Sequence, residues 1–210
     1  MKTRITKIET QSVMPKLLHD IVRVLDDDGV IAYPTETFYG LGGNCFSRKV
    51  LKKIFKIKNR PVSKGLPVLV SDLGMARILV SDLPPTFHDL AARFWPGPLT
   101  LVLSAAPHLP VELVGPKRTI GIRLPDVPWL LALIRETGVP LITTSANISG
   151  EGEIASPEEV IRLFQEKVDL IVDGGPTPGG KPSTVVDLTG EKPVLVRKGV
   201  IGHKELGKFV

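Results

Sequence analysis

The 210-residue chain is 42% hydrophobic and 23% charged, a composition typical of globular proteins rather than of disordered segments. No apolar run approaches the roughly 20 residues that a membrane-spanning helix needs, and no signal-peptide core follows the first residues. We therefore expect neither a membrane protein nor a secreted one. Cys45 is the single cysteine and cannot form a disulfide within the chain, which favours a reducing cytoplasm. The four histidines stand apart from one another, and their spacing disfavours a His/Cys metal site.

The net charge of +5 is concentrated in one segment. Between Thr37 and Asp72 the chain has no acidic residue, although it has eight basic ones, so the rest of the chain is net negative. A solvated helix face would explain some of these cations but not the missing acids. The segment therefore predicts an anionic partner, either a nucleotide or a nucleic acid. The eight residues are Arg48, Lys49, Lys52, Lys53, Lys56, Lys58, Arg60 and Lys64.

The first predicted elements are a helix over 13–28 and a buried strand over 30–33. Pro34 ends the strand, and the polar residues Thr35–Thr37 and then three glycines follow it. Hydroxyls and a carboxylate at the end of a buried strand, backed by glycines that admit a ligand, indicate a binding site. The alternative is a strand followed by an ordinary glycine-rich turn.

The second predicted helix spans 47–59, with Ser47 as its N-cap. Lys58 falls seven residues after Leu51, on the apolar face of this helix, where a charge is costly unless an anion or a polar cleft receives it. Pro61 disfavours helical geometry at Arg60, so the helix should end there. Lys58 and Arg60 are therefore predicted to lie together at a helix-to-loop corner.

The middle of the chain predicts a scaffold of alternating helices and strands. On the predicted strand 119–124, Thr119, Gly121 and Arg123 share one face. The strand 141–143 ends in Thr143 and runs into hydroxyl and amide side chains, of which Ser145 and Asn147 could wrap phosphate oxygens. A polar loop is the alternative there. The other expected strands cover 66–70, 99–103 and 170–172, and the other expected helices cover 73–80, 84–94, 127–137 and a segment that begins at 156.

The segment 173–184 matches the glycine and lysine spacing of a Walker A loop. Pro182 stands where that loop needs Ser or Thr, and a strand follows where a helix must start, so we reject a P-loop. The segment could still place Ser183 against a ligand. A hairpin of the strands 184–188 and 193–197 completes the pattern. The residues alone thus predict a single α/β domain of the α+β type over 1–210, with one mixed, twisted β-sheet flanked by helices and a large, open, anion-binding cleft.

Six motifs in order resemble the YrdC/TsaC family of threonylcarbamoyl-AMP synthases. They are Tyr-Pro-Thr-Glu-Thr-x-Tyr-Gly-Leu-Gly at 33–42, Lys-x-Arg-Pro at 58–61, Trp-Pro-Gly-Pro-Leu-Thr at 95–100, Ser-Ala-Asn at 145–147, Ser-Thr at 183–184 and Arg-x-Gly at 197–199. The resemblance covers about 13–200, which leaves 201–210 as a tail. Longer relatives carry an extra C-terminal domain, and the resemblance implies the single-domain form here.

The resemblance implies a synthase that forms threonylcarbamoyl-adenylate and pyrophosphate from L-threonine, bicarbonate and ATP for tRNA modification. Mg²⁺ is expected to bind through the ATP phosphates, with no protein ligand assigned to it, and Ser145 and Asn147 are expected to hold the triphosphate, its metal or the adenosine. The resemblance also implies a cytoplasmic enzyme whose partners are a tRNA threonylcarbamoyl-transferase complex and tRNA or double-stranded RNA. It assigns Lys58 and Arg60 as catalytic cations. The implied ATP-binding residues are Lys58, Arg60, Thr119, Ser145, Asn147 and Arg197. The implied threonine-binding residues are Thr35, Arg123, Thr143 and Ser183, with Lys64 a weaker candidate and Glu36 and Thr37 holding the turn.

Two departures and two rival functions accompany the resemblance. Cys45 stands where relatives often carry Ala, and we expect it to be a small buried residue. Longer relatives have a His in the threonine pocket, and no His lies between 20 and 87 here, so threonine recognition must differ.

The rivals are a tRNA- or double-stranded-RNA-binding protein without synthase activity and a regulatory subunit that binds nucleotide without turnover.

Overall fold

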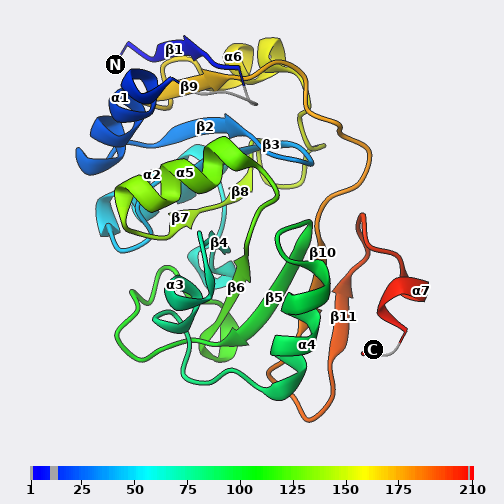
Figure 1. Ribbon diagram of the computed structural model, residues 1–210. Coiled ribbons are helices and arrows are strands. Elements are labelled where there is room, and N and C mark those ends of the chain that lie inside the picture. Colours follow the sequence, from blue (N-terminus) through cyan, green and yellow to red (C-terminus); the bar gives the residue numbers. More distant parts are fainter. Residues whose placement is uncertain (1, 10–13, 208) are drawn as a thin grey trace.

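Two β-sheets organise the chain in the computed structural model, which describes residues 2–9, 14–207 and 209–210 (Figure 1). The first sheet has the order β1 (Arg4–Lys7), β9 (Leu170–Asp173), β2 (Ile31–Pro34), β3 (Tyr39–Gly42) and β8 (Thr144–Ser145). The second has the order β11 (Val194–Arg197), β10 (Thr184–Asp187), β5 (Leu99–Ser104), β6 (Thr119–Arg123), β4 (Val68–Leu69) and β7 (Leu141–Ile142). Both sheets contain parallel and antiparallel pairs.

The predicted fold class is confirmed, because mixed sheets are flanked by helices, but the prediction of one sheet is wrong. The strands divide where β7 passes directly into β8, on either side of Thr143. The amide of Thr143 donates to the carbonyl of Pro67 at 2.8 Å, and that of Ile142 donates to Gly43 at 2.8 Å. The predicted strand 141–143 thus ends early, since its last residue is the link between the two sheets.

Helices cover both faces of the five-stranded sheet. Side chains of Ile31 and Tyr33 in β2 pack with α1 and α5, while Ala32 faces α2 and α6. This alternation is the period of two that a strand buried on both faces imposes. The helices are α1 (Pro15–Asp26), α2 (Arg48–Lys58), α3 (Leu73–Arg77), α4 (Pro85–Phe94), α5 (Pro128–Thr137), α6 (Pro157–Phe164) and α7 (His203–Leu206), with 3-10 turns η1 (Val62–Lys64) and η2 (Pro116–Arg118).

Several local predictions are confirmed. Helix α2 begins after Ser47, whose hydroxyl accepts from the amide of Val50 at 3.2 Å, and it ends at Lys58 because Asn59 turns to a left-handed φ of 49°. Cys45 is fully buried, and burial raises the pKa of its thiol. The start of the predicted helix 13–28 at residue 13 lies outside the described residues, and α1 runs from Pro15.

The C-terminal hairpin of β10 and β11 is present, and the tail beyond it is attached to the sheet. The hydroxyl of Thr184 donates to the carbonyl of Ile201 at 2.9 Å and accepts from its amide at 3.0 Å. None of the helices in the described part of the chain combines the length and the apolar character that crossing a bilayer requires.

Gly42 provides a test of the junction between the sheets. A Cβ on Gly42 would lie 2.2 Å from the carbonyl oxygen of Ile142 and 2.7 Å from the Tyr33 ring, whose hydroxyl donates to that same carbonyl at 3.1 Å. We expect Gly42→Ala to lower the free energy of unfolding in urea by about 3 kcal/mol, as an overpacked core does.

Gly40→Ala is the matched control in the same strand. Its Cβ would meet side-chain atoms of Tyr33 no closer than 3.3 Å, so we expect a change within about 1 kcal/mol. Equal effects of the two substitutions would contradict this account of the junction.

Candidate functional site

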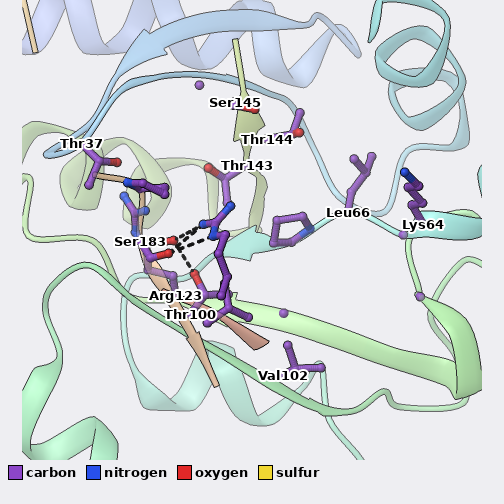
Figure 2. Close-up of a pocket in the computed structure, with 18 of the residues that line it drawn as sticks. Thr37, Lys64, Leu66, Thr100, Val102, Arg123, Thr143, Thr144, Ser145 and Ser183 are labelled. Atoms are coloured by element: carbon purple, nitrogen blue, oxygen red, sulfur yellow. Dashed lines mark hydrogen bonds between the residues drawn. The ribbon is translucent and has the colours of Figure 1, made fainter. Parts of the chain in front are cut away.

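A pocket of about 430 Å³ lies between the two sheets and takes residues from both (Figure 2). The five-stranded sheet contributes the turn after β2 and the end of β8, and the six-stranded sheet contributes β5, β6, β10 and β11. Eight of the ten predicted site residues line it. The structure shows this pocket, and the larger open cleft that we expected stays a prediction. The eight are Thr35, Arg60, Thr119, Arg123, Thr143, Ser145, Ser183 and Arg197.

Lys58 is behind the pocket wall rather than in it. Its side chain is 1% exposed, and its Nζ donates to the carbonyls of Ser145 and Asn147 at 2.5 and 2.8 Å and to Asn147 Oδ1 at 2.8 Å. An ammonium has three hydrogens, so these three acceptors use all of them. Lys58 therefore fixes the shape of the turn that follows β8, which we call the 145–147 turn.

The 145–147 turn is a connected polar network. The hydroxyl of Ser145 donates to Asn147 Oδ1 at 2.6 Å, and Asn147 Nδ2 donates to the carbonyl of Glu151 at 2.6 Å. Asn147 is 7% exposed and is the second predicted residue that does not line the pocket. Ser145, in contrast, lines it and carries the network to the pocket surface.

Burial makes the cations of this corner stronger acids than usual, because it lowers their pKa values. Desolvation and, to a smaller extent, the positive charge of Arg60 lower the pKa of Lys58 to about 8, and Glu153 opposes the shift. Burial also lowers the pKa of Arg60, whose Nη2 donates to the carbonyls of Lys64 and Gly65 at 3.2 and 3.1 Å. Arg60 Nε is buried without a partner among the described residues. The corner is thus short of negative charge, which an anion would supply.

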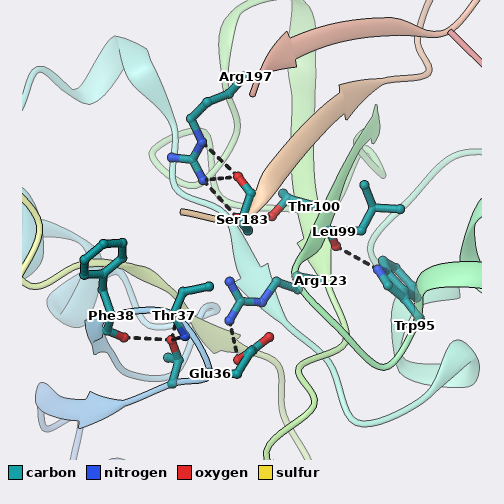
Figure 3. Close-up of polar contacts among 10 residues, drawn as sticks. Glu36, Thr37, Phe38, Trp95, Leu99, Thr100, Arg123, Ser183 and Arg197 are labelled. Carbon is teal, nitrogen blue, oxygen red and sulfur yellow. Dashed lines mark hydrogen bonds and ion pairs between the residues drawn. The ribbon is translucent and has the colours of Figure 1, made fainter. Parts of the chain in front are cut away.

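Arg197, at the end of β11, binds neutral oxygens of Ser183 (Figure 3). Its Nε and Nη2 donate to the carbonyl of Ser183 at 3.1 and 2.9 Å, and Nη2 also donates to the Ser183 hydroxyl at 2.9 Å. That hydroxyl lies 3.0 Å from the hydroxyl of Thr100. Burial lowers the pKa of Arg197, Glu153 opposes this, and the charge of Arg123 adds to it.

Arg123 is paired with a carboxylate that the sequence assigned only to the turn. Its Nη2 lies 2.7 Å from Glu36 Oε2, and the two side chains are 7% and 16% exposed (Figure 3). The prediction that Thr119, Gly121 and Arg123 share a face of β6 is confirmed, because all three line the pocket. Arg123 therefore reaches the pocket with part of its charge already compensated.

Thr35 faces the same pocket as Arg123, but its hydroxyl is engaged in the turn. It donates to the carbonyl of Phe38 at 2.7 Å and accepts from the amide of Thr37 at 3.2 Å. Thr143 lines the pocket at the junction of the sheets. Lys64, the weaker candidate, also lines it.

Sequence reasoning missed Glu153 and Thr100. Glu153 lines the pocket, and burial raises the pKa of its carboxyl, while the charges of Arg197 and Lys58 oppose that rise. Its signal was an acid six residues after Asn147, in a stretch between 150 and 156 to which the sequence analysis assigned no element or role. Thr100 lies in β5 beside Ser183. No group of three or more His, Cys, Asp or Glu side chains that could hold a metal occurs in the part of the chain that the structure describes.

Comparison with known proteins places this geometry in context. A Sua5/YciO/YrdC family model, described as "Telomere recombination", matches residues 23–199. The threonylcarbamoyl-AMP synthase of Pyrococcus abyssi is 39% identical over 86% of this chain, and that of Bacillus subtilis is 40% identical over 87%. The chain spans only 53% of the length of each of these relatives. The structure of Pyrococcus abyssi Sua5 complexed with L-threonine matches with a TM-score of 0.93 at 35% identity, over 98% of this chain and 60% of that one.

The buried ammonium of Lys58 provides a direct test of the electrostatics. We expect its Nζ to titrate near pH 8 in the ligand-free protein, which heteronuclear NMR of the lysine side chains would measure. Arg60→Gln should raise this pKa because it removes a like charge, and Glu153→Gln should lower it because it removes an opposite one. An ordinary lysine pKa, or shifts of the opposite sign in the two variants, would contradict the described environment.

Proposed function

The chain belongs to the Sua5/YciO/YrdC family, and from that premise we propose that it is a threonylcarbamoyl-AMP synthase. It forms threonylcarbamoyl-adenylate and pyrophosphate from L-threonine, bicarbonate and ATP. The observation that supports this most is a single pocket that brings Arg60, Arg123 and Arg197 together with the 145–147 turn held by Lys58. Such a pocket suits a reaction between two anionic substrates.

The reaction needs little covalent help from the protein. The amine of threonine and carbon dioxide or bicarbonate form a carbamate, and a carbamate oxygen then attacks the α-phosphorus of ATP. The new P–O bond replaces the bond to the bridging oxygen of the β-phosphate, and pyrophosphate leaves with its electron pair. Positioning and charge neutralisation supply most of the catalysis in such a transfer.

The cations of the pocket are proposed to serve the triphosphate. Arg60 and Arg197 bind only neutral oxygens in the free protein, so their charges are available to phosphate. Lys58 acts through the 145–147 turn, which it holds in shape, and through its electric field. Ser145 and Asn147 then offer hydroxyl and amide groups to phosphate oxygens or the metal, and Thr119 contacts the nucleotide.

The part of the pocket around Arg123 is proposed to bind threonine. Arg123 would take the carboxylate in a charge-assisted contact, with Ser183 close to it. Thr35 and Thr143 line the same pocket and would surround the rest of the amino acid. No His is among the described residues that line the pocket, so His is not proposed to take part.

Mg²⁺ is proposed to enter with ATP. Magnesium is usually held by substrate phosphates with one or two carboxylates, and Glu153 is a half-buried carboxylate on the pocket wall that fits this requirement. The pKa of Glu153 is raised by burial, so a cation beside it would favour the charged carboxylate. When bound, the metal would supply neutralisation of phosphate charge, while Glu153 would orient it.

RNA contact is a second proposal, carried by helix α2. Lys49, Lys52 and Lys56 are exposed on it, and of the three only Lys49 forms an ion pair among the described residues, with Asp28 at 3.9 Å. These lysines suit the sugar–phosphate backbone of tRNA or double-stranded RNA. We further propose that the enzyme works in the cytoplasm and passes its adenylate to a tRNA threonylcarbamoyl-transferase complex.

Lys58→Ala tests the proposed synthase. It removes the ammonium that holds the carbonyls of Ser145 and Asn147, so we expect threonine-dependent release of pyrophosphate from ATP to fall by at least about 100-fold, the scale of losing a preorganised electrostatic group. Lys56→Ala, on the exposed face of the same helix, is the matched control and should stay within twofold, the range of surface changes remote from a site.

The same assay with and without bicarbonate separates the rival functions. RNA binding without threonine dependence would support the RNA-binding protein, and ATP binding without pyrophosphate release would support the regulatory subunit. Retention of activity within severalfold in the Lys58→Ala variant would overturn the role of Lys58 while leaving the synthase in place.

A further inference from the structure

Glu36 reaches Arg123 from outside the main pocket. Arg123 lines the 430 Å³ pocket, whereas Glu36 lines a second pocket of about 350 Å³ together with Pro34, Trp129 and the 174–178 segment. Their contact of 2.7 Å therefore lies between the two cavities (Figure 3). The carboxylate can hold the guanidinium without occupying the space where a ligand would meet it.

The pair is also incomplete. Glu36 Oε1 and Arg123 Nε are both buried and have no hydrogen-bond partner among the described residues, so the contact is single and not forked. Buried donors without a partner are uncommon in native proteins and indicate a missing acceptor. A second carboxylate at Arg123 would provide that acceptor, whereas Glu36 alone does not.

Arg123 differs from the other cations in and behind the pocket wall in that a carboxylate lies beside it. Lys58, Arg60 and Arg197 donate to carbonyls, an amide oxygen and a hydroxyl, all of them neutral. Arg123 alone among these four has a carboxylate within ion-pair distance in the described part of the chain, while Glu153 acts on Lys58 and Arg197 from farther away. A guanidinium binds carboxylate and phosphate alike through forked contacts, so charge decides between them. A carboxylate, with its single charge, loses less attraction than a polyphosphate when the charge of Arg123 is partly cancelled.

We propose that Glu36 is a positioning residue that sorts the two anionic substrates, a role that rests on the proposed function. It fixes the Arg123 guanidinium from behind and cancels enough of its charge that this corner accepts the amino-acid carboxylate and not a phosphate. The polyphosphate is left to Arg60, Arg197 and the turn held by Lys58. The place that each substrate takes in the pocket is then set by which cations have a carboxylate beside them.

Glu36→Gln tests this sorting, because the amide oxygen can still accept from Arg123 but the charge is gone. We would measure L-threonine binding by calorimetry with and without saturating pyrophosphate, a probe of the phosphate subsite. In the parent protein we expect pyrophosphate to change the threonine Kd by less than about twofold, whereas in Glu36→Gln it should raise that Kd about tenfold or more, equivalent to about 1.4 kcal/mol.

Two further variants separate charge from geometry. Glu36→Asp keeps the charge on a shorter side chain, so threonine binding should weaken while pyrophosphate still fails to compete. Asp169→Asn removes the carboxylate of the Lys53–Asp169 ion pair, which does not line the pocket, and should leave the pyrophosphate effect as in the parent.

The outcomes distinguish this inference from the synthase proposal. If the parent protein shows no threonine-dependent pyrophosphate release, the proposed function fails, and the sorting role fails with it. If the parent is active but pyrophosphate competes with threonine there, or leaves threonine binding to Glu36→Gln unchanged, the sorting role alone is overturned. The parent measurement needs no variant, so a Glu36→Gln protein that does not fold still leaves a decisive result.

Discussion

A buried ammonium must be surrounded by oxygens, and the site depends on how Lys58 meets that requirement. Transfer of a charged group from water into the interior is costly unless hydrogen bonds replace its hydration. Lys58 obtains its three acceptors from Ser145 and Asn147, which lie about 90 positions further along the chain. The helix α2 and the turn after β8 therefore hold one another, and the turn is shaped for a ligand before one arrives.

The division into two sheets creates the space for that ligand. β7 and β8 are consecutive strands of different sheets, so the chain leaves one sheet and enters the other at Thr143. The ends of β2, β6 and β10 then surround one pocket with residues from distant parts of the sequence. Gly42 lets the backbones approach closely at this junction, because even a methyl group there would meet the Ile142 carbonyl. The pocket is thus a consequence of a sheet boundary rather than of a long loop.

Patterns within a single element predicted much of this arrangement. The apolar period of α2 identified Lys58 as the residue aimed inward, and alternation along 119–124 identified the face that Arg123 shares with Thr119. The pairing of Arg123 with Glu36 could not be predicted this way, because 87 positions separate them and the pattern within one element does not show which distant residue lies beside it. The two sheets were missed for a similar reason: β4 and β7 have two residues each, and their ends are set by hydrogen bonds to other strands. The strand β1, which precedes every predicted element, pairs with β9 across most of the chain.

The central claim is that one pocket holds both substrates and assigns each to its own cations. A crystal structure of this chain with L-threonine and a non-hydrolysable ATP analogue tests it most directly. We predict the threonine carboxylate on Arg123, opposite Glu36, and the triphosphate against Arg60, Arg197 and the 145–147 turn. Phosphate oxygens on Arg123, or a threonine carboxylate bound away from it, would contradict the account.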